Sequence, residues 1–312
     1  MSIVRSNISN LMKVDLDIVL QEAWKNLSHE LILNTIFNVM DSDKKEENNQ
    51  TVGGMGLLAV KEEGEDLSNK IFRQGYKTTY THKTLGMYAQ ISMEAVDDEQ
   101  YGTISRLPQA MARSADATYN YYMSRIFGQC TSTSEDFITG GDGVALLSTS
   151  HPLSVSGGTC SNKPSTDADL SLSTLWDGVD VFYEMLDDAG KPIANSPKYL
   201  LIPHQSLQVA HELLDSEKYP ESAENAINAL RKVTNIEIVP WPYWLGNQDS
   251  DCWFLLADKA ATDDYPLRMY RRMPYKTESD NDFFSGDFLY RVICRFSCGF
   301  DDWRFVFGST GG

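Results

Sequence analysis

The segment LPQAMARSADATYNYYMSRIF, residues 107–127, determines the architecture that the rest of the sequence must fit. Its apolar side chains recur every three or four positions over about six turns, which is the period of one buried helix face. Pro108 is compatible with a helix only near its start, and Gly128 is typical of a helix end. We therefore predict one long helix over residues 105–127. Its apolar stripe is Ile104, Leu107, Met111, Ala115, Tyr119, Tyr122 and Ile126.

The chain before this helix has two contrasting parts. Residues 15–40 carry apolar residues such as Leu16, Leu20 and Trp24 at helical spacing, which predicts an amphipathic helix, and the polar run DSDKKEENNQ ends that pattern. Residues 57–96 are rich in Thr and Tyr and contain the charged stretch KEEGED, which predicts a long two-stranded excursion with a solvated tip. Such an excursion cannot bury two faces alone, so we expect a neighbouring molecule to hold it.

The chain after the helix alternates helices and strands. Residues 131–169 are rich in Gly, Ser and Thr and predict a long irregular loop. Residues 170–260 predict a compact α/β unit, with a helix that begins at a Ser171 or Ser173 cap and strands at 198–202, 236–239 and 252–257. Pro203 is expected to begin another helix in this unit.

The C-terminal stretch predicts an amphipathic strand. In DFLYRVICRF, residues 287–296, Phe288 and every second residue after it share one face, which we expect to close a core against the long helix. Gly299 is expected to reverse the chain. Three arginines, Arg291, Arg295 and Arg304, are expected to face outward, where the carboxylates of a partner could meet them.

Composition limits the classes of function. Lys and Arg number 27 against 44 Asp and Glu, a formal charge of −17, so the chain lacks the basic clusters that grip nucleic acid. Its start has no secretory signal pattern, and no apolar run approaches the roughly 20 residues that cross a bilayer. The five cysteines are odd in number and form no CxxC pair, which favours reduced, buried thiols. We expect an intracellular globular protein.

Motifs for metals and phosphates are incomplete. HELIL at His29 and HELLD at His211 have Leu33 and Asp215 where a zinc protease has its second histidine. DSDKKEENNQTV has Lys45 at a position that a calcium loop reserves for an oxygen ligand. GGMG and GGDG lack the lysine and the helix of a phosphate loop. We expect no metal, no cofactor and no catalytic residues.

Two features keep other functions open. His151 lies near Asp142 and Cys160 in the sequence, so an α/β hydrolase is one alternative, although a histidine before a proline in a polar loop is more typical of backbone hydrogen bonding. Aromatic residues could instead stack a ligand in a small-molecule binding module, although core filling or subunit contact is the commoner use. These residues are Trp241, Tyr243, Trp244 and Trp253.

The order of these elements resembles a known family. The segments GYKTTYTHKTLGMYAQISMEAVDDEQYG (75–102), LPQAMARSADATYNYYMSRIF, GGDGVALLSTSHPL (140–153) and CGFDDWRFVFGS are similar to the major capsid proteins of tailed bacteriophages with the Hong Kong 97 fold, in particular to the Mu-like major head subunit. The resemblance implies an α+β fold with an N-terminal arm, an extended β-hairpin loop, a peripheral domain with a long spine helix, and an axial α/β domain.

The resemblance also implies boundaries and partners. Residues 1–50 would be the arm, 51–96 the extended loop over an adjacent subunit, 97–169 with 261–312 the peripheral domain, and 170–260 the axial domain. The partner of the loop would be another copy of the chain, in hexamers and pentamers of a shell around double-stranded DNA that the acidic wall touches only loosely. We expect no membrane partner.

Assembly would take place in the host cytoplasm and leave the protein in the virion. A separate scaffold is expected because only about 50 residues precede the loop, together with a portal and decoration proteins. The candidates for charge pairing between subunits are Glu62, Glu63, Glu65, Asp66, Arg73, Lys77, Asp97, Asp98, Arg291, Arg295 and Arg304.

Overall fold

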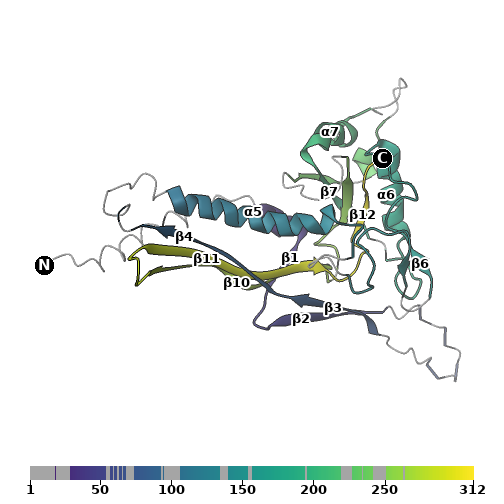
Figure 1. The fold of residues 1–312 in the computed structure, drawn as a ribbon. Helices are drawn as coiled ribbons and strands as arrows, with labels where there is room; N and C mark the ends of the chain where they lie inside the picture. The colour runs from purple at the N-terminus through teal and green to yellow at the C-terminus, as the bar shows by residue number, and fades with distance from the viewer. Residues whose placement is uncertain are drawn as a thin grey trace.

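The chain folds into an elongated body in which one long helix runs along a four-stranded sheet and ends against a second four-stranded sheet (Figure 1). The structure is a computed structural model. It describes residues 18, 29–53, 57–58, 60–61, 63–64, 66–67, 74–92, 94, 106–133, 140–153, 157–193, 195–218, 227–233, 235–241, 251–262 and 264–312.

The long helix α5 (Arg106–Gly128) confirms the helix predicted from the apolar stripe. Its first half packs against the first sheet, where Met111 contacts a cluster that contains Tyr290. The ring centroids of Tyr119 and Phe296 lie 4.5 Å apart. At the far end of the helix, the ring centroid of Phe127 lies 5.2 Å from that of Phe254 in the second sheet. One helix therefore joins both sheets.

The first sheet has the strand order β1 (Asn38–Asp41), β10 (Leu267–Asn281), β11 (Phe288–Phe300) and β4 (Lys83–Ile91). β1 is parallel to β10 and the other pairs are antiparallel. The predicted buried face of β11 is confirmed. Gly299 lies within β11 rather than at a reversal, because β11 stays paired with β10 as far as Phe300.

The second sheet has the order β12 (Val306–Ser309), β9 (Trp253–Ala257), β7 (Pro197–Ile202) and β8 (Glu237–Pro240). All five residues of β9 are buried, as in a strand covered on both faces. After β11 the chain crosses to the second sheet, where its last strand, β12, pairs with β9 and completes the sheet built by residues 197–257.

Helices complete this second unit. α6 (Leu172–Glu184) begins at the predicted cap Ser171, whose side chain forms a capping box with Thr174. The ordered turn η1 (His204–Ser206) and α7 (Leu207–Asp215) follow β7, and α8 (Leu230–Val233) precedes β8. A helix after Pro203 is therefore confirmed.

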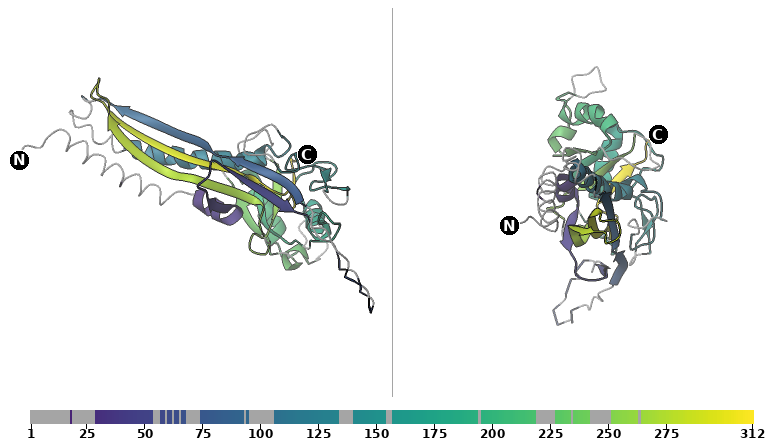
Figure 2. Two further views of the ribbon diagram at one scale, coloured as in Figure 1. Left: turned by 90° about the horizontal axis from the view of Figure 1, so that it is seen from below. Right: turned by 60° about the vertical axis from the view of Figure 1, so that its left-hand side comes forward.

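A two-stranded ribbon of β2 (Glu46–Val52) and β3 (Gln74–Thr81) extends beside the first sheet (Figure 2). The predicted excursion over 57–96 is partly wrong. Residues 83–91 form β4, which pairs with β11, and the first ribbon strand β2 lies earlier, beginning within the polar run DSDKKEENNQ. Alternating half-burial along β2 reflects a strand paired on one edge and solvated on one face.

The N-terminal helix prediction is corrected in the same way. Its described part includes α2 (His29–Ile36), but Asn38–Asp41 form β1, because pairing with the edge of β10 outweighs a weak local helix preference. A short hairpin of β5 (His151–Pro152) and β6 (Thr159–Cys160) interrupts the predicted irregular loop.

Candidate functional site

Three elements meet at the carboxylate of Asp301, directly after β11. Tyr80 of β3 donates its hydroxyl to Oδ1 at 2.7 Å, and Asn49 of β2 donates its amide to Oδ2 at 3.0 Å. The Arg268 guanidinium of β10 forms an ion pair with Oδ2 at 2.5 Å, and the side chains of Arg268 and Asp301 are only 10% and 4% exposed. Burial raises the pKa of Asp301, while Tyr80 and Arg268 oppose that shift. A buried charged network therefore fixes the ribbon to the sheet.

His82 occupies the single position between β3 and β4. Its Nε2 lies 3.2 Å from Ser42 Oγ and its Nδ1 lies 3.0 Å from Ser297 Oγ. Ser42 donates its own hydroxyl to Glu47 at 2.8 Å, so it must accept the Nε2 proton, and Ser297 then donates to Nδ1. Burial lowers the pKa of His82. The neutral imidazole thus ties the ribbon to both β11 and the segment after β1.

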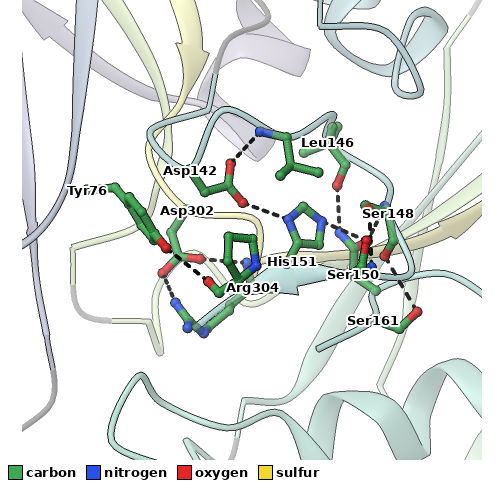
Figure 3. Close-up of polar contacts among 12 residues, drawn as sticks. Tyr76, Asp142, Leu146, Ser148, Ser150, His151, Ser161, Asp302 and Arg304 are labelled. Carbon is green, nitrogen blue, oxygen red and sulfur yellow. Dashed lines mark hydrogen bonds and ion pairs between the residues drawn. The ribbon is translucent and has the colours of Figure 1, made fainter. Parts of the chain in front are cut away.

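His151 is fully buried in a polar cluster (Figure 3). Its Nδ1 lies 2.7 Å from Asp142 Oδ2, and its Nε2 lies 3.3 Å from Asn162 Oδ1. Asn162 in turn accepts from the Ser148 amide and donates to the Leu146 carbonyl, which fixes the orientation of its side chain. The expectation of backbone hydrogen bonds for His151 is therefore wrong, because two side chains occupy its nitrogens.

Arg304 lies beside this cluster and is buried rather than outward-facing. Its guanidinium pairs with Asp188 at 2.6 Å and with Asp302 at 2.6 Å, and only 11% of its side chain is exposed. Tyr76 of β3 completes the contact by donating its hydroxyl to the Pro152 carbonyl at 3.4 Å (Figure 3). The expected outward orientation of Arg304 is corrected: the turn after β11 folds it onto acids of the same chain.

The other predicted interface residues that the structure describes are exposed, except for Arg295. Arg291 is exposed on β11 and forms a hydrogen-bonded ion pair with Glu278 of β10, whereas Arg295 is half-buried. Glu63, Asp66 and Lys77 are exposed, as a contact surface requires. Their role between subunits stays a prediction. The remaining candidates, Glu62, Glu65, Arg73, Asp97 and Asp98, lie outside the described residues.

Exposed apolar side chains gather at two places. Between β2 and β3, the exposed fractions run from 74% for Leu57 to 96% for Leu58. At the turn between β10 and β11, Phe283 is 93% and Phe284 is 95% exposed. This second patch was not predicted from the sequence, although two adjacent phenylalanines within the turn-rich run DNDFFSGD are a visible signal.

The described residues offer little for the alternative chemistries. Trp241 and Trp253 are fully buried in the core, with ring N–H groups donated to Asn120 and to the Ala168 carbonyl, so they do not form a stacking platform. Tyr243 and Trp244 lie outside the described ranges. In those ranges, no group of three His, Cys, Asp or Glu side chains could hold a metal ion. No described helix is long and apolar enough to span a membrane.

The structure is similar to solved structures of a phage procapsid, a GTA particle capsid and a virus-like particle. The procapsid of bacteriophage JBD30 matches with a TM-score of 0.53 at 14% identity, covering 99% of this chain and 77% of that one. The capsid of an empty GTA particle matches with a TM-score of 0.55 at 10% identity, covering 88% of each chain. A virus-like particle from Pyrococcus furiosus matches with a TM-score of 0.51 at 9% identity, covering 95% and 98%. The predicted Hong Kong 97-type fold is confirmed.

Sequence comparison supplies the family. No curated protein matches the chain. The family profile described as phage capsid protein matches residues 75–308, a range that contains α5 and most strands of both sheets. Since this match covers most of the sequence, the chain belongs to the phage capsid protein family.

Proposed function

We propose that this chain is the major capsid protein of a tailed bacteriophage and that its copies assemble, as hexamers and pentamers, into the icosahedral head shell around double-stranded DNA. The observation that carries the proposal is the family match over residues 75–308. The shared fold with shell-forming proteins supports it.

The proposed division of labour is the one that the resemblance implies, and the exposed apolar surface supports it. The part of the segment 51–96 that precedes β4 would lie over an adjacent subunit, the long helix would support the peripheral domain, and residues 170–260 would surround the centre of each capsomer. Four apolar side chains between the ribbon strands need such a neighbour, because an isolated subunit leaves them in water. They are Leu57, Leu58, Val60 and Leu67, all at least 74% exposed.

The chemistry of the chain suits a passive wall. The net charge of −17 repels phosphate, so packaged DNA would touch the shell loosely and without sequence preference. The buried position of His151, with both ring nitrogens facing side-chain oxygens, leaves no access for a substrate. We infer a virion component without catalysis, assembled in the host cytoplasm with a scaffold and a portal. The JBD30 capsid is decorated with minor capsid protein trimers, and decoration is a further expectation for this chain.

The test is assembly of the purified chain, followed by negative-stain electron microscopy and size-exclusion chromatography. Replacing residues 54–73 by a short Gly/Ser turn keeps the β2–β3 pairing, which closes at Val52 and Gln74. We expect rings, sheets or shells from the wild type and far fewer from the replacement. A quadruple serine variant of the four exposed apolar residues should behave alike, while Lys61→Gln serves as the matched control.

A monodisperse monomer would contradict the proposal if it persisted at high concentration, under crowding and with scaffold proteins present. Circular dichroism of each variant separates loss of assembly from loss of folding. An assembly that is indifferent to the replacement of residues 54–73 would contradict the role given to this segment while leaving the shell function standing.

A further inference from the structure

We propose that the turn between β10 and β11 is an aromatic knob that inserts into an apolar groove of a second copy of this chain. The knob comprises residues 282–287. The groove lies between α5 and the strands β4 and β11. This inference rests on the proposed shell function, because it needs copies of the chain to meet.

The knob is an ordered turn rather than a loose loop. The backbone N–H of Asp282 donates to the Asp287 carbonyl, and that of Gly286 donates to the Asp282 carbonyl, both at 2.9 Å. Asp282 Oδ1 also accepts from the Phe284 backbone at 2.9 Å. Gly286 has a φ of +79°, a conformation that suits glycine. Docking a turn that is already ordered costs less conformational entropy than docking a flexible segment.

Among the described residues, none covers the two phenylalanine side chains of the knob. Phe283 and Phe284 are 93% and 95% exposed, whereas Tyr88, another exposed aromatic of the same sheet, is 71% exposed. The two rings lie edge to face with centroids 5.7 Å apart, so they form one compact apolar projection. Because they are exposed, neither ring occupies the groove of its own subunit. In the proposed assembly a second copy of the chain covers them.

The groove provides a matching apolar cavity of about 490 Å³. Met87 and Tyr121 lie in its lining and remain 39% and 37% exposed, so the surface is reachable from solvent. The hydroxyl of Thr118, a polar group in the lining, already has a hydrogen-bond partner, since it donates to the Ser114 carbonyl at 2.7 Å. The described lining contains no charged side chain and includes Leu85, Met87, Met111, Ala115, Tyr121 and Val292.

Charge favours this pairing between copies. Asp280, Asp282 and Asp287 surround the phenylalanines, and residues 280–287 contain no basic residue. On the groove side, the Arg125 guanidinium lies 5.5 Å from the centre of the Tyr121 ring, one helical turn beyond the groove lining. The acidic knob would therefore meet the Arg125 guanidinium beside the groove, which counters part of the repulsion expected between two chains of charge −17. Knob and groove are different surfaces, so repeated contacts generate a ring or a larger assembly.

A disulfide test identifies the occupant of the groove. The variant Phe284→Cys/Ala117→Cys, in a Cys160→Ser background, should form covalent multimers after mild oxidation of assembled particles, whereas neither single cysteine variant should. Cross-linking of Phe284→Cys alone would show knob-to-knob contact and overturn the proposal. Cross-linking of Leu58→Cys with Ala117→Cys at a higher yield would assign the groove to the segment between β2 and β3. Particles without any cross-link in the double variant would also overturn it.

A second variant separates this inference from the shell function. Phe283→Ser/Phe284→Ser should lower the particle yield at least tenfold without changing the thermal unfolding of the subunit, and Phe283→Tyr/Phe284→Tyr should retain most of the yield. Wild-type particles with unchanged assembly of the serine variant would overturn the knob alone. Failure of the wild type to assemble under any condition would overturn both proposals.

Discussion

The imidazole ring of His151 lies flat on the indole ring of Trp303, with centroids 4.4 Å apart and planes inclined by 12°. The same imidazole bonds Asp142 at 2.7 Å. A turn that follows α5 and the turn that follows β11 are therefore held together by one buried side chain, and Tyr76 of β3 contacts the same hairpin through the Pro152 carbonyl.

Replacing His151 by alanine should lower the free energy of unfolding by about 3 to 5 kcal/mol, because Asp142 Oδ2 loses its buried partner and the ring stacked on Trp303 is removed, while Asp142 Oδ1 keeps the Val144 backbone N–H. Urea denaturation followed by tryptophan fluorescence measures this change. The exposed His204 provides the control, and His204→Ala should stay within about 0.5 kcal/mol of the wild type. Equal effects of the two variants would contradict a structural role for the cluster.

Replacing Tyr80 by phenylalanine should cost about 1.5 to 3 kcal/mol, the usual contribution of a hydrogen bond to a charged group, since the hydroxyl bonds the buried Asp301 carboxylate. Amide hydrogen exchange in β2 and β3 should be faster in the Tyr80→Phe variant than in the wild type, and this increase should exceed any increase in β9. Tyr88→Phe, at a tyrosine that is 71% exposed, is the matched control and should be nearly neutral. Unchanged exchange in the ribbon would show that Asp301 does not anchor it.

The ribbon anchor at His82 predicts a dependence of stability on pH. Burial holds its pKa below the ordinary 6.5 in the folded chain, so as pH falls below about 6.5 the unfolded chain binds a proton that the folded chain does not. The free energy of unfolding should therefore decrease on acidification from pH 7 to 5. His82→Gln, which retains an amide donor and acceptor, should show a smaller decrease over that range. Parallel pH profiles of the two proteins would contradict the assignment.

Gly178 tests the packing of α6 on β12. Alanine normally stabilises a helix interior by about 1 kcal/mol relative to glycine. Here a Cβ would lie 2.9 Å from the Phe307 ring, so Gly178→Ala should instead destabilise the protein by roughly 1 kcal/mol through overpacking. The neighbouring exposed Asp177, changed to alanine, is the control. A rise in thermal unfolding temperature for Gly178→Ala would contradict this packing.

The cysteines should differ sharply in reactivity. Burial raises the pKa of Cys298 to about 12 and that of Cys294 to about 11, so few thiolates form at neutral pH. Cys160 is the half-exposed cysteine, and iodoacetamide should modify it first. Mass spectrometry of native and urea-unfolded protein measures the order of labelling. Early labelling of Cys298 in the native protein would show that the core opens.

Much of the fold was predictable because local patterns and tertiary packing agree. The apolar stripe around Met111 and Tyr119 defined α5 within a residue at its end, and the alternation from Phe288 to Phe296 identified the buried face of β11. Ser171 was one of two residues predicted to cap the helix α6, and it is the N-cap in the structure. In each case the period of the sequence matches the period of one buried face, so few long-range contacts were needed to choose the structure.

Other features could not be predicted, because their partners are distant in sequence. The local sequence predicts that Arg304 is a surface arginine. In the structure the turn after β11 brings it to Asp188, which lies more than a hundred residues earlier. The local sequence likewise predicts an ordinary loop histidine at position 151, whereas in the structure Trp303 stacks on the His151 ring.

The sequence alone determined the long helix, the amphipathic strands, the acidic surface and the resemblance to capsid proteins, because these depend on local spacing and composition. Only the tertiary structure decided which strands pair and which charges are buried. The polar run at 46–52 became a ribbon strand because β3 supplied its hydrogen bonds, and the last strand joined the second sheet because β9 offered a free edge to Val306–Ser309. Strand pairing and ion pairing draw their free energy from groups far apart in the chain, and no local pattern specifies those partners.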